Sequence, residues 1–160
     1  FLMNVVFEGC SAWCGKARCF GVTGEAEKPI VGLTFRDCDI LFRDATWDNE
    51  RLGGLVVIVE SNPHNQLLLQ DVLFVDIRIH RDTGRAVNVT VLNRELTGMQ
   101  LGGIVFRNVS CTEAALPFLF RAGNGENHIE VRLETLTVGG VPIDGQWILS
   151  DSWAEVERIS

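Results

Sequence analysis

Three carboxylate side chains are candidates for acid–base chemistry because each one follows or separates apolar stretches. Glu25 and Glu60 each come after such a stretch, and Asp48 lies in the polar segment between them. Two carboxyl groups, one protonated and one ionised, can donate and accept protons on opposite sides of a reacting bond. We expect Glu25 to act with Asp48 or Glu60. The alternative for Glu25 is an ion pair with Arg18, since structural ion pairs also perturb pKa values.

Two aromatic residues and one histidine are candidates for binding a substrate. Trp13 and Trp47 could stack against a sugar ring, although packing at a corner of the fold suits a large aromatic side chain equally well. His64 lies in the turn-rich segment Ser-Asn-Pro-His-Asn and could exchange protons, or it could simply be an exposed loop residue. The sequence identifies no partner for His80 or His128.

Five cysteines leave at least one thiol unpaired. The cluster Cys10, Cys14 and Cys19 lacks the paired spacing of common zinc sites and has no nearby histidine, so packing is favoured over metal binding. The Asp and Asn residues show no EF-hand spacing that would indicate calcium. We expect neither a metal nor another cofactor.

A short motif recurs along the chain and organises it. Each copy reads apolar-x-Phe/Leu-x-x-apolar-x-small/apolar, where x is any residue; the first copy is Val5-x-Phe7-x-x-Cys10-x-Ala12. The central Phe or Leu positions are separated by 28, 39, 32 and 27 residues. The copies begin at Val5, Leu33, Val72, Ile104 and Val131.

The alternation of apolar positions with other residues in each half of a copy predicts strands. The two-residue step in the middle of the copy predicts a bend. A further apolar stretch follows each of the first four copies, at residues 20–22, 55–59, 87–91 and 118–120. About three strands per unit is typical of a parallel β-helix, in which successive coils stack. We therefore predict an all-β, right-handed parallel β-helix of about five coils in a single domain over 1–160. An antiparallel sandwich is the alternative, but it does not require one inward pattern to return in every unit.

Stacked coils would align the repeated side chains in interior ladders. Cys10 and Cys38 would then be neighbours, but their parallel side chains would strain a disulfide, so we expect free buried thiols. One ladder would contain Phe7, Phe35, Phe74, Phe106 and Leu133, and the next Cys10, Cys38, Ile77, Val109 and Leu136.

The two ends of the chain differ from the repeats. Ser152 and Glu155 have the spacing of a helix capping box, and Trp153, Val156 and Ile159 would share one helical face, which predicts a short helix within a cap over 146–160. An apolar start without an initiator Met suggests the C-terminal part of a longer protein. The first coil would expose an open edge, which missing coils or another copy of the chain could cover.

Composition excludes two classes of partner. The 160 residues carry a formal net charge of −7, so the basic surplus that nucleic-acid binding requires is missing. The apolar run at 55–59 is far shorter than the roughly 20 residues of a membrane-spanning helix.

Two segments resemble bacterial right-handed β-helix proteins related to the polygalacturonase-type glycoside hydrolases. WCGKARCFGVTGE, residues 13–25, matches the family pattern at Trp, Arg, Phe, Val and Glu, and IVGLTFRDCDIL, residues 30–41, matches it through Phe-x-Asp-Cys-Asp-Ile. Residues 72–79 are similar to the next coil of that family. The resemblance covers about half the chain directly and implies the fold more strongly than it implies a substrate.

The positions at which the sequence departs from the family pattern include polar residues that could take part in catalysis. Cys14 and Gly15 replace an Asn-Asp pair, Ala26 replaces Thr, and Phe42 replaces a His. The adjacent aspartates, the His-Gly pair and the Arg-x-Lys that the resemblance implies for the enzymes are also missing from this sequence. Their coils would lie upstream or would have been lost.

The resemblance implies a carbohydrate partner and a secreted or periplasmic location. A glycoside hydrolase would use Glu25, Asp48 and Glu60 as catalytic carboxylates, with Trp13, Arg18, Trp47 and His64 in contact with a poly- or oligosaccharide. The alternative is a non-catalytic glycan-binding or assembly module, which loss of the family's Asp and His residues favours. A polysaccharide lyase is the weaker third hypothesis because the chain has only Lys16 and Lys28 as lysines.

Overall fold

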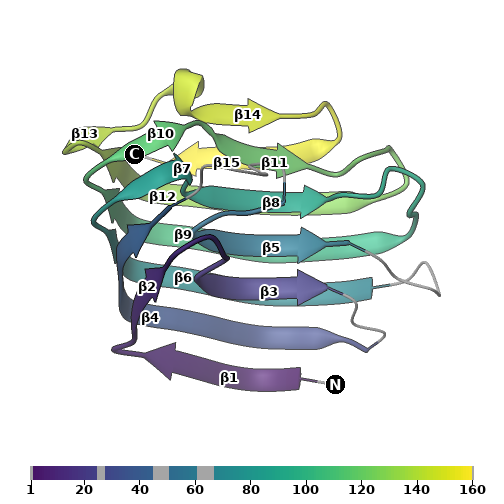
Figure 1. The fold of residues 1–160 in the computed structure, drawn as a ribbon. Helices are drawn as coiled ribbons and strands as arrows, with labels where there is room; N and C mark the ends of the chain where they lie inside the picture. The colour runs from purple at the N-terminus through teal and green to yellow at the C-terminus, as the bar shows by residue number, and fades with distance from the viewer. Residues whose placement is uncertain (1, 25–27, 45–50, 61–66, 160) are drawn as a thin grey trace.

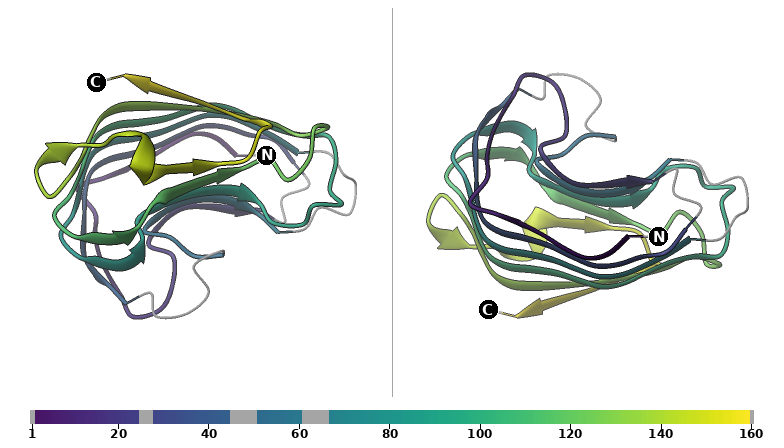
Figure 2. Two further views of the ribbon diagram at one scale, coloured as in Figure 1. Left: turned by 90° about the horizontal axis from the view of Figure 1, so that it is seen from above. Right: turned by 90° about the horizontal axis from the view of Figure 1, so that it is seen from below.

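The computed structural model describes residues 2–24, 28–44, 51–60 and 67–159, and these form a β-solenoid (Figure 1). Sheet A stacks long parallel strands along the axis of the solenoid, and sheet B stacks shorter parallel strands on the opposite side (Figure 2). Along its stack, sheet A contains β1 (Leu2–Glu8), β4 (Ile30–Arg43), β6 (Leu67–Ile79), β9 (Met99–Cys111), β12 (His128–Val138) and β15 (Ala154–Ile159). Sheet B contains β3 (Phe20–Gly24), β5 (Leu55–Val59), β8 (Val87–Val91), β11 (Phe118–Arg121) and β14 (Ile148–Ser150).

Short elements complete each turn. β2 (Ser11–Cys14) pairs with the end of β4, and β7 (Asp82–Arg85) pairs with β4 and with β10 (Ala114–Leu116). β13 (Val141–Pro142) and the 3-10 turn η1 (Gly145–Trp147) precede the last strands. Among the described strands only β12 and β13 pair antiparallel, so the sandwich alternative is wrong and the all-β parallel prediction is confirmed. The five motif copies span about four turns.

A column of left-handed residues bends each motif copy at its predicted two-residue step. Gly9, Asp37, Asp76, Asn108 and Thr135 have φ between 51° and 66°, and register places them at one level of the stack. Gly, Asp and Asn adopt this conformation at low cost, since Gly has no Cβ and a short polar side chain can hydrogen-bond locally, whereas a β-branched Thr is strained there. The bend turns sheet A around the core, as the view along the stack shows (Figure 2).

The predicted interior ladders are present. Phe7, Phe35, Phe74 and Phe106 stack with ring centroids 5.1, 5.1 and 4.7 Å apart and interplanar angles of 9° or less, and Leu133 continues the column. Stacking of this kind adds to the burial of each ring. Phe74 and Phe106 are fully buried, but Phe7 at the β1 edge is 45% exposed. That missing coils or another copy of the chain cover this edge stays a prediction.

The expected helix near the C-terminus is wrong, because residues 154–159 form strand β15. β15 pairs in parallel with β12 from Ala154 opposite Ile129 to Ile159 opposite Glu134. The edge of β12 satisfies the backbone of this segment, and an isolated helix of this length is marginal in water. Asp151 accepts hydrogen bonds from the backbone N–H groups of Trp153 and Ala154, so it, and not Ser152, organises the turn into the strand.

The outer face of sheet B is covered at β5 and β8, whereas much of the outer face of sheet A is exposed to solvent. Val56 and Ile58 point away from the interior ladders yet are buried, and Leu52 is buried as well. The side-chain amide of Asn88 donates to the carbonyl oxygen of Leu52 at 3.0 Å, which ties the segment before β5 to sheet B. The outer face of sheet A therefore exposes more surface to a large ligand than the middle of sheet B does. No helix in the described part of the chain has the length and apolar character to cross a membrane.

Candidate functional site

Of the predicted site residues, Arg18 and Glu60 are brought together. Their side chains form an ion pair, and Arg18 Nε also donates to the carbonyl oxygen of Arg51 at 2.9 Å. The carboxylate partner of Arg18 in the structure is therefore Glu60, whereas the sequence suggested Glu25. The Arg18 and Glu60 side chains are engaged with each other. Glu25, Trp47, Asp48 and His64 lie outside the described residues.

Trp13 lies on the outer surface and is 74% exposed. Its ring lies 5.7 Å from the ring of Phe42, tilted by 43°, and the guanidinium carbon of Arg81 lies 5.7 Å from the same Phe42 ring. We call Trp13, Phe42 and Arg81 the aromatic platform. An exposed Trp supported by another ring offers a fixed apolar surface to a flat ligand at low entropic cost.

A bulge explains why this platform faces outward. The register of β2 on β4 runs from Ala12 opposite Ile40 to Trp13 opposite Phe42, which leaves Leu41 unpaired. Ile40 points into the core, and the extra residue lets both Leu41 and Phe42 point away from the core. Without the bulge, strict alternation would turn Phe42 inward with Ile40.

A charged cluster lies next to the platform, on β4 and at the end of β6. Asp39 accepts hydrogen bonds from Arg78 Nε at 2.8 Å and from Arg78 Nη2 at 2.6 Å, and His80 Nε2 lies 2.9 Å from its Oδ1. Asp37 contacts Arg78 Nη2 at 2.9 Å. We call Asp37, Asp39, Arg78 and His80 the charged cluster. Arg78, followed by His80, holds the pKa of Asp39 down at about 2, so this carboxylate is an acceptor and not an acid at neutral pH.

The spacing of the motif copies carries a signal for this cluster. Phe35 and Phe74 are register partners 39 residues apart, and the same step takes Asp39 to Arg78. Extending the alignment of these two copies to their polar positions places the two charges side by side. It also brings His80 within reach of Asp39, a partner that the apolar pattern alone does not indicate.

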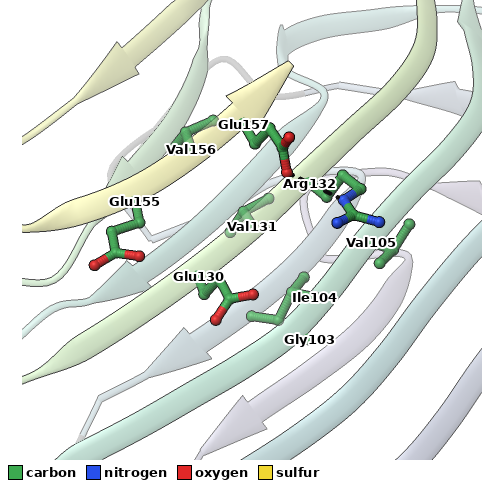
Figure 3. A pocket seen from close by; sticks show the side chains of 9 residues that line it. All are labelled: Gly103, Ile104, Val105, Glu130, Val131, Arg132, Glu155, Val156 and Glu157. Carbon is green, nitrogen blue, oxygen red and sulfur yellow. Dashed lines mark hydrogen bonds and ion pairs between the residues drawn. The ribbon is translucent and has the colours of Figure 1, made fainter. Parts of the chain in front are cut away.

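A second site is an open groove of about 510 Å³ on the outer face of β9, β12 and β15 (Figure 3). The groove residues that carry charge are Glu130 and Arg132 from β12 and Glu155 and Glu157 from β15. Glu130 is the register partner of Glu155, and Arg132 is the partner of Glu157. Adjacent strands lie about 4.8 Å apart, so Glu130 and Glu155 are flexible side chains rooted side by side.

The other charges in and beside the groove have partners of their own. Arg132 Nε lies 3.2 Å from Glu157 Oε2, and Arg132 Nη1 lies 3.6 Å from Glu134 Oε1. Arg107 pairs with Glu134 and keeps the pKa of that carboxyl below its usual range. His128 Nε2 lies 3.6 Å from Glu130 Oε2. Glu130 therefore has a histidine beside it, while it lines the groove together with Glu155.

The backbone shapes the floor of this groove. Register shifts between Ile129 and Val131, so β9 places both Gly102 and Gly103 against the single Glu130 of β12. Gly103 has φ of 60°, and a Cβ there would lie 2.6 Å from Asp71 Oδ1. Only glycine fits this position without displacing its neighbour. By sequence alone Gly102-Gly103 is typical of a turn, and the groove escapes prediction because Glu155 falls within the expected helix.

No family model, curated protein or solved structure matches the chain. The structure shows a parallel β-solenoid, which is compatible with the β-helix fold that the resemblance implied. Within the described ranges, no group of three or more His, Cys, Asp or Glu side chains is arranged to hold a metal ion.

Proposed function

We propose that this solenoid is a carbohydrate-binding protein, related to the polygalacturonase-type β-helix proteins, that holds a poly- or oligosaccharide on the outer face of sheet A. The observation that carries the proposal is the aromatic platform, in which Trp13 is 74% exposed yet supported by Phe42. Sugar rings present an apolar C–H face and a polar rim, so a ring surface flanked by hydrogen-bonding groups suits them.

The charged cluster supplies the polar part of this site. Asp39 is an ionised acceptor, while Arg78 and His80 are donors held in position by it. Charge-assisted hydrogen bonds to sugar hydroxyls are stronger than neutral ones and depend on fixed geometry. The platform and the cluster lie on the same stretch of β4 and at the end of β6 with the segment that follows it, so one ligand can contact both. A secreted or periplasmic location, where extracellular glycans are encountered, belongs to this proposal.

Replacing Trp13 tests the binding function. Trp13→Ala should weaken glycan binding on the order of tenfold, which corresponds to about 1.4 kcal/mol. Trp153→Ala is the matched control because Trp153 is also exposed, at 48%, but lies on the last turn of the solenoid. Both variants and the parent chain are screened on a glycan array, and hits are quantified by calorimetry. Equal affinity of Trp13→Ala and the parent for every hit would contradict the proposal.

A second candidate function, glycoside hydrolysis, is favoured by the groove. Glu130 and Glu155 come from adjacent turns, and hydrolysis needs two carboxyl groups about 5 Å apart for retention or about 6.5–9.5 Å apart for inversion. Side chains rooted on neighbouring strands can span either separation. One carboxyl would protonate the glycosidic oxygen, and the other would attack the anomeric carbon or activate a water.

Hydrolysis is tested by the release of reducing ends from the glycans that bind. Glu130→Gln and Glu155→Gln should each lower the rate by at least about a hundredfold, because each removes a proton-transfer group. Glu95→Gln serves as the control, since Glu95 is exposed and does not line the groove. Release that is unaffected by both groove substitutions would exclude this site, while complete absence of release would leave the binding function alone.

A further inference from the structure

Two cysteines near the start of the chain approach each other closely. Cys14 ends β2, Cys19 precedes β3, and their Sγ atoms lie 2.8 Å apart. Both side chains are neither fully buried nor fully exposed. A bonded pair of sulfurs is about 2.05 Å apart, so these two thiols need to move by under about 1 Å to be joined.

The other three cysteines are placed differently. The Cys10 thiol points to the carbonyl oxygen of Glu8 at 3.6 Å, and the Cys38 thiol points to that of Arg36 at 3.3 Å. These two are stacked neighbours with parallel side chains, which is the geometry that strains a disulfide. Cys111 is buried, with burial raising the pKa of its thiol to about 12, so it is protected from reaction.

We propose that Cys14 and Cys19 are a modification site, at which a small-molecule disulfide such as oxidised glutathione converts the two thiols into an intrachain disulfide. The Cys14 thiolate attacks one sulfur of oxidised glutathione and releases one glutathione thiolate. The Cys19 sulfur then attacks the Cys14 sulfur of the mixed disulfide and releases the second glutathione. Two protein thiols are oxidised, one glutathione disulfide is reduced to two thiols, and two protons leave the protein.

The order of attack follows from the surroundings of Cys19. Burial, together with the neighbouring Cys14 sulfur, raises the pKa of the Cys19 thiol well above its usual range. A thiol with a raised pKa is a poor first nucleophile because little thiolate is present. Once Cys14 carries glutathione, the second step is intramolecular and is favoured by the short separation of the two sulfurs.

The disulfide would fasten a segment that already links two turns. Residues 14–19 include Arg18, whose guanidinium pairs with Glu60 and with the Arg51 carbonyl oxygen. The backbone N–H of Asp44 donates to the carbonyl oxygens of Cys14 and Gly15 at 3.3 and 3.0 Å. Closing the loop keeps these contacts in register, so the oxidised protein should also unfold at a higher temperature than the reduced one.

The experiment treats the reduced chain with oxidised glutathione and counts thiols after unfolding. The chain has five cysteines, so the count should fall from five to three without a retained glutathione. Trypsin cleaves after Lys16 and Arg18, which lie between the two cysteines, and Pro29 blocks cleavage after Lys28. A non-reduced digest should therefore contain peptide 1–16 joined to peptide 19–36. Peptide 1–16 holds both Cys10 and Cys14, so variants are needed to identify the sulfur.

Three variants complete the test. Cys10→Ser should still give the joined peptides, because Cys14 is intact, and Cys38→Ser should behave in the same way. Cys14→Ser should not give them, and any loss of its thiols should be accompanied by bound glutathione. The proposal is overturned if the parent chain keeps five thiols, if the joined peptides persist in Cys14→Ser, or if the bridge connects Cys10 with Cys38. If a variant does not fold, a chymotryptic digest of the parent chain, which cuts after Trp13 and so separates Cys10 from Cys14, identifies the bridged sulfur.

Discussion

At the scale of single residues, the charged cluster makes the free energy of unfolding depend on pH in the acid range. The pKa of Asp39 is lowered from 3.8 to about 2, chiefly by the Arg78 hydrogen bonds and then by His80. Because the folded value is the lower one, this stabilisation is fully present above about pH 4 and is lost as the pH falls toward 2. Arg78→Met should raise the Asp39 pKa toward its ordinary value and flatten this part of the stability curve.

Carboxyl chemical shifts followed by NMR give the Asp39 pKa directly, and urea unfolding between pH 2 and pH 5 gives the stability. Arg121→Met is a suitable control because Arg121 lies on sheet B, away from Asp39. An Asp39 pKa that stays near 2 in Arg78→Met would mean that His80, and not Arg78, accounts for the shift.

A buried ion pair is the second residue-scale feature with a measurable effect. Arg43 and Asp82 are fully buried and joined by two hydrogen bonds of 2.8 Å, and Arg43 Nη2 also donates to the Arg85 carbonyl oxygen at 2.8 Å. Arg43 Nη1 has no hydrogen-bond partner among the described residues. Asp82→Ala should lower the free energy of unfolding by about 3–5 kcal/mol because it leaves a buried charge without its counter-ion.

The double variant Arg43→Met with Asp82→Leu separates loss of the pair from loss of packing. It removes both charges and fills a similar volume, so most of the stability lost in Asp82→Ala should return. Urea unfolding of the parent chain, the single variant and the double variant measures both steps. A double variant as unstable as the single one would show that the hydrogen bonds, and not the unpaired charge, dominate.

At the scale of elements, the column of bends contains one unfavourable residue. Thr135 is exposed with φ of 57°, a conformation that costs a β-branched residue roughly 1–2 kcal/mol. Thr135→Gly removes this cost, and it should raise the free energy of unfolding by up to about 1 kcal/mol after the greater entropy of unfolded glycine is included. Thr137→Gly, two residues further along β12 where φ is not positive, should instead destabilise, and thermal unfolding compares the two.

The same elements show how much of the fold a local pattern can predict. The motif predicts the register of the Phe ladder, the sheet B strands and the position of the bend, because each depends on a local pattern that recurs. A second level of left-handed residues, at Asn4, Gly32, Asp71 and Gly103, lies outside the motif copies, so the motif does not predict it. The sequence does not predict β15, because residues 154–159 form a strand only by pairing with the edge of β12. That edge exists only in the folded chain.

Candidate sites were harder to predict than strands for a related reason. The sequence predicts that Trp13 can stack on a ligand, but the support of its ring by Phe42 depends on a bulge in the register of β2. Glu130 and Glu155 become neighbours only through the β12–β15 pairing. Side chains that act together across turns are thus predicted only when every intervening register is known.

At the scale of the whole molecule, charge should decide which glycans bind at the site proposed on the outer face of sheet A. The chain carries a net charge of −7, to which the groove residues Glu130 and Glu155 contribute, while Arg132 in the same groove is engaged with Glu157. Repulsion acts over the Debye length, about 30 Å at 0.01 M salt and about 10 Å at 0.1 M. An anionic glycan should therefore be repelled at low salt and less so at high salt.

We expect neutral oligosaccharides to bind with nearly the same affinity at both salt concentrations, and polyuronates to bind more weakly and to gain affinity as salt rises. Calorimetric titration of a neutral and a uronic-acid oligosaccharide of equal length checks this, with Glu130→Gln combined with Glu155→Gln expected to reduce the difference. Tighter binding of the polyuronate at low salt would show instead that Arg78 and Arg81 dominate the field at the binding site, and that the substrates of the polygalacturonase-type enzymes suit this chain after all.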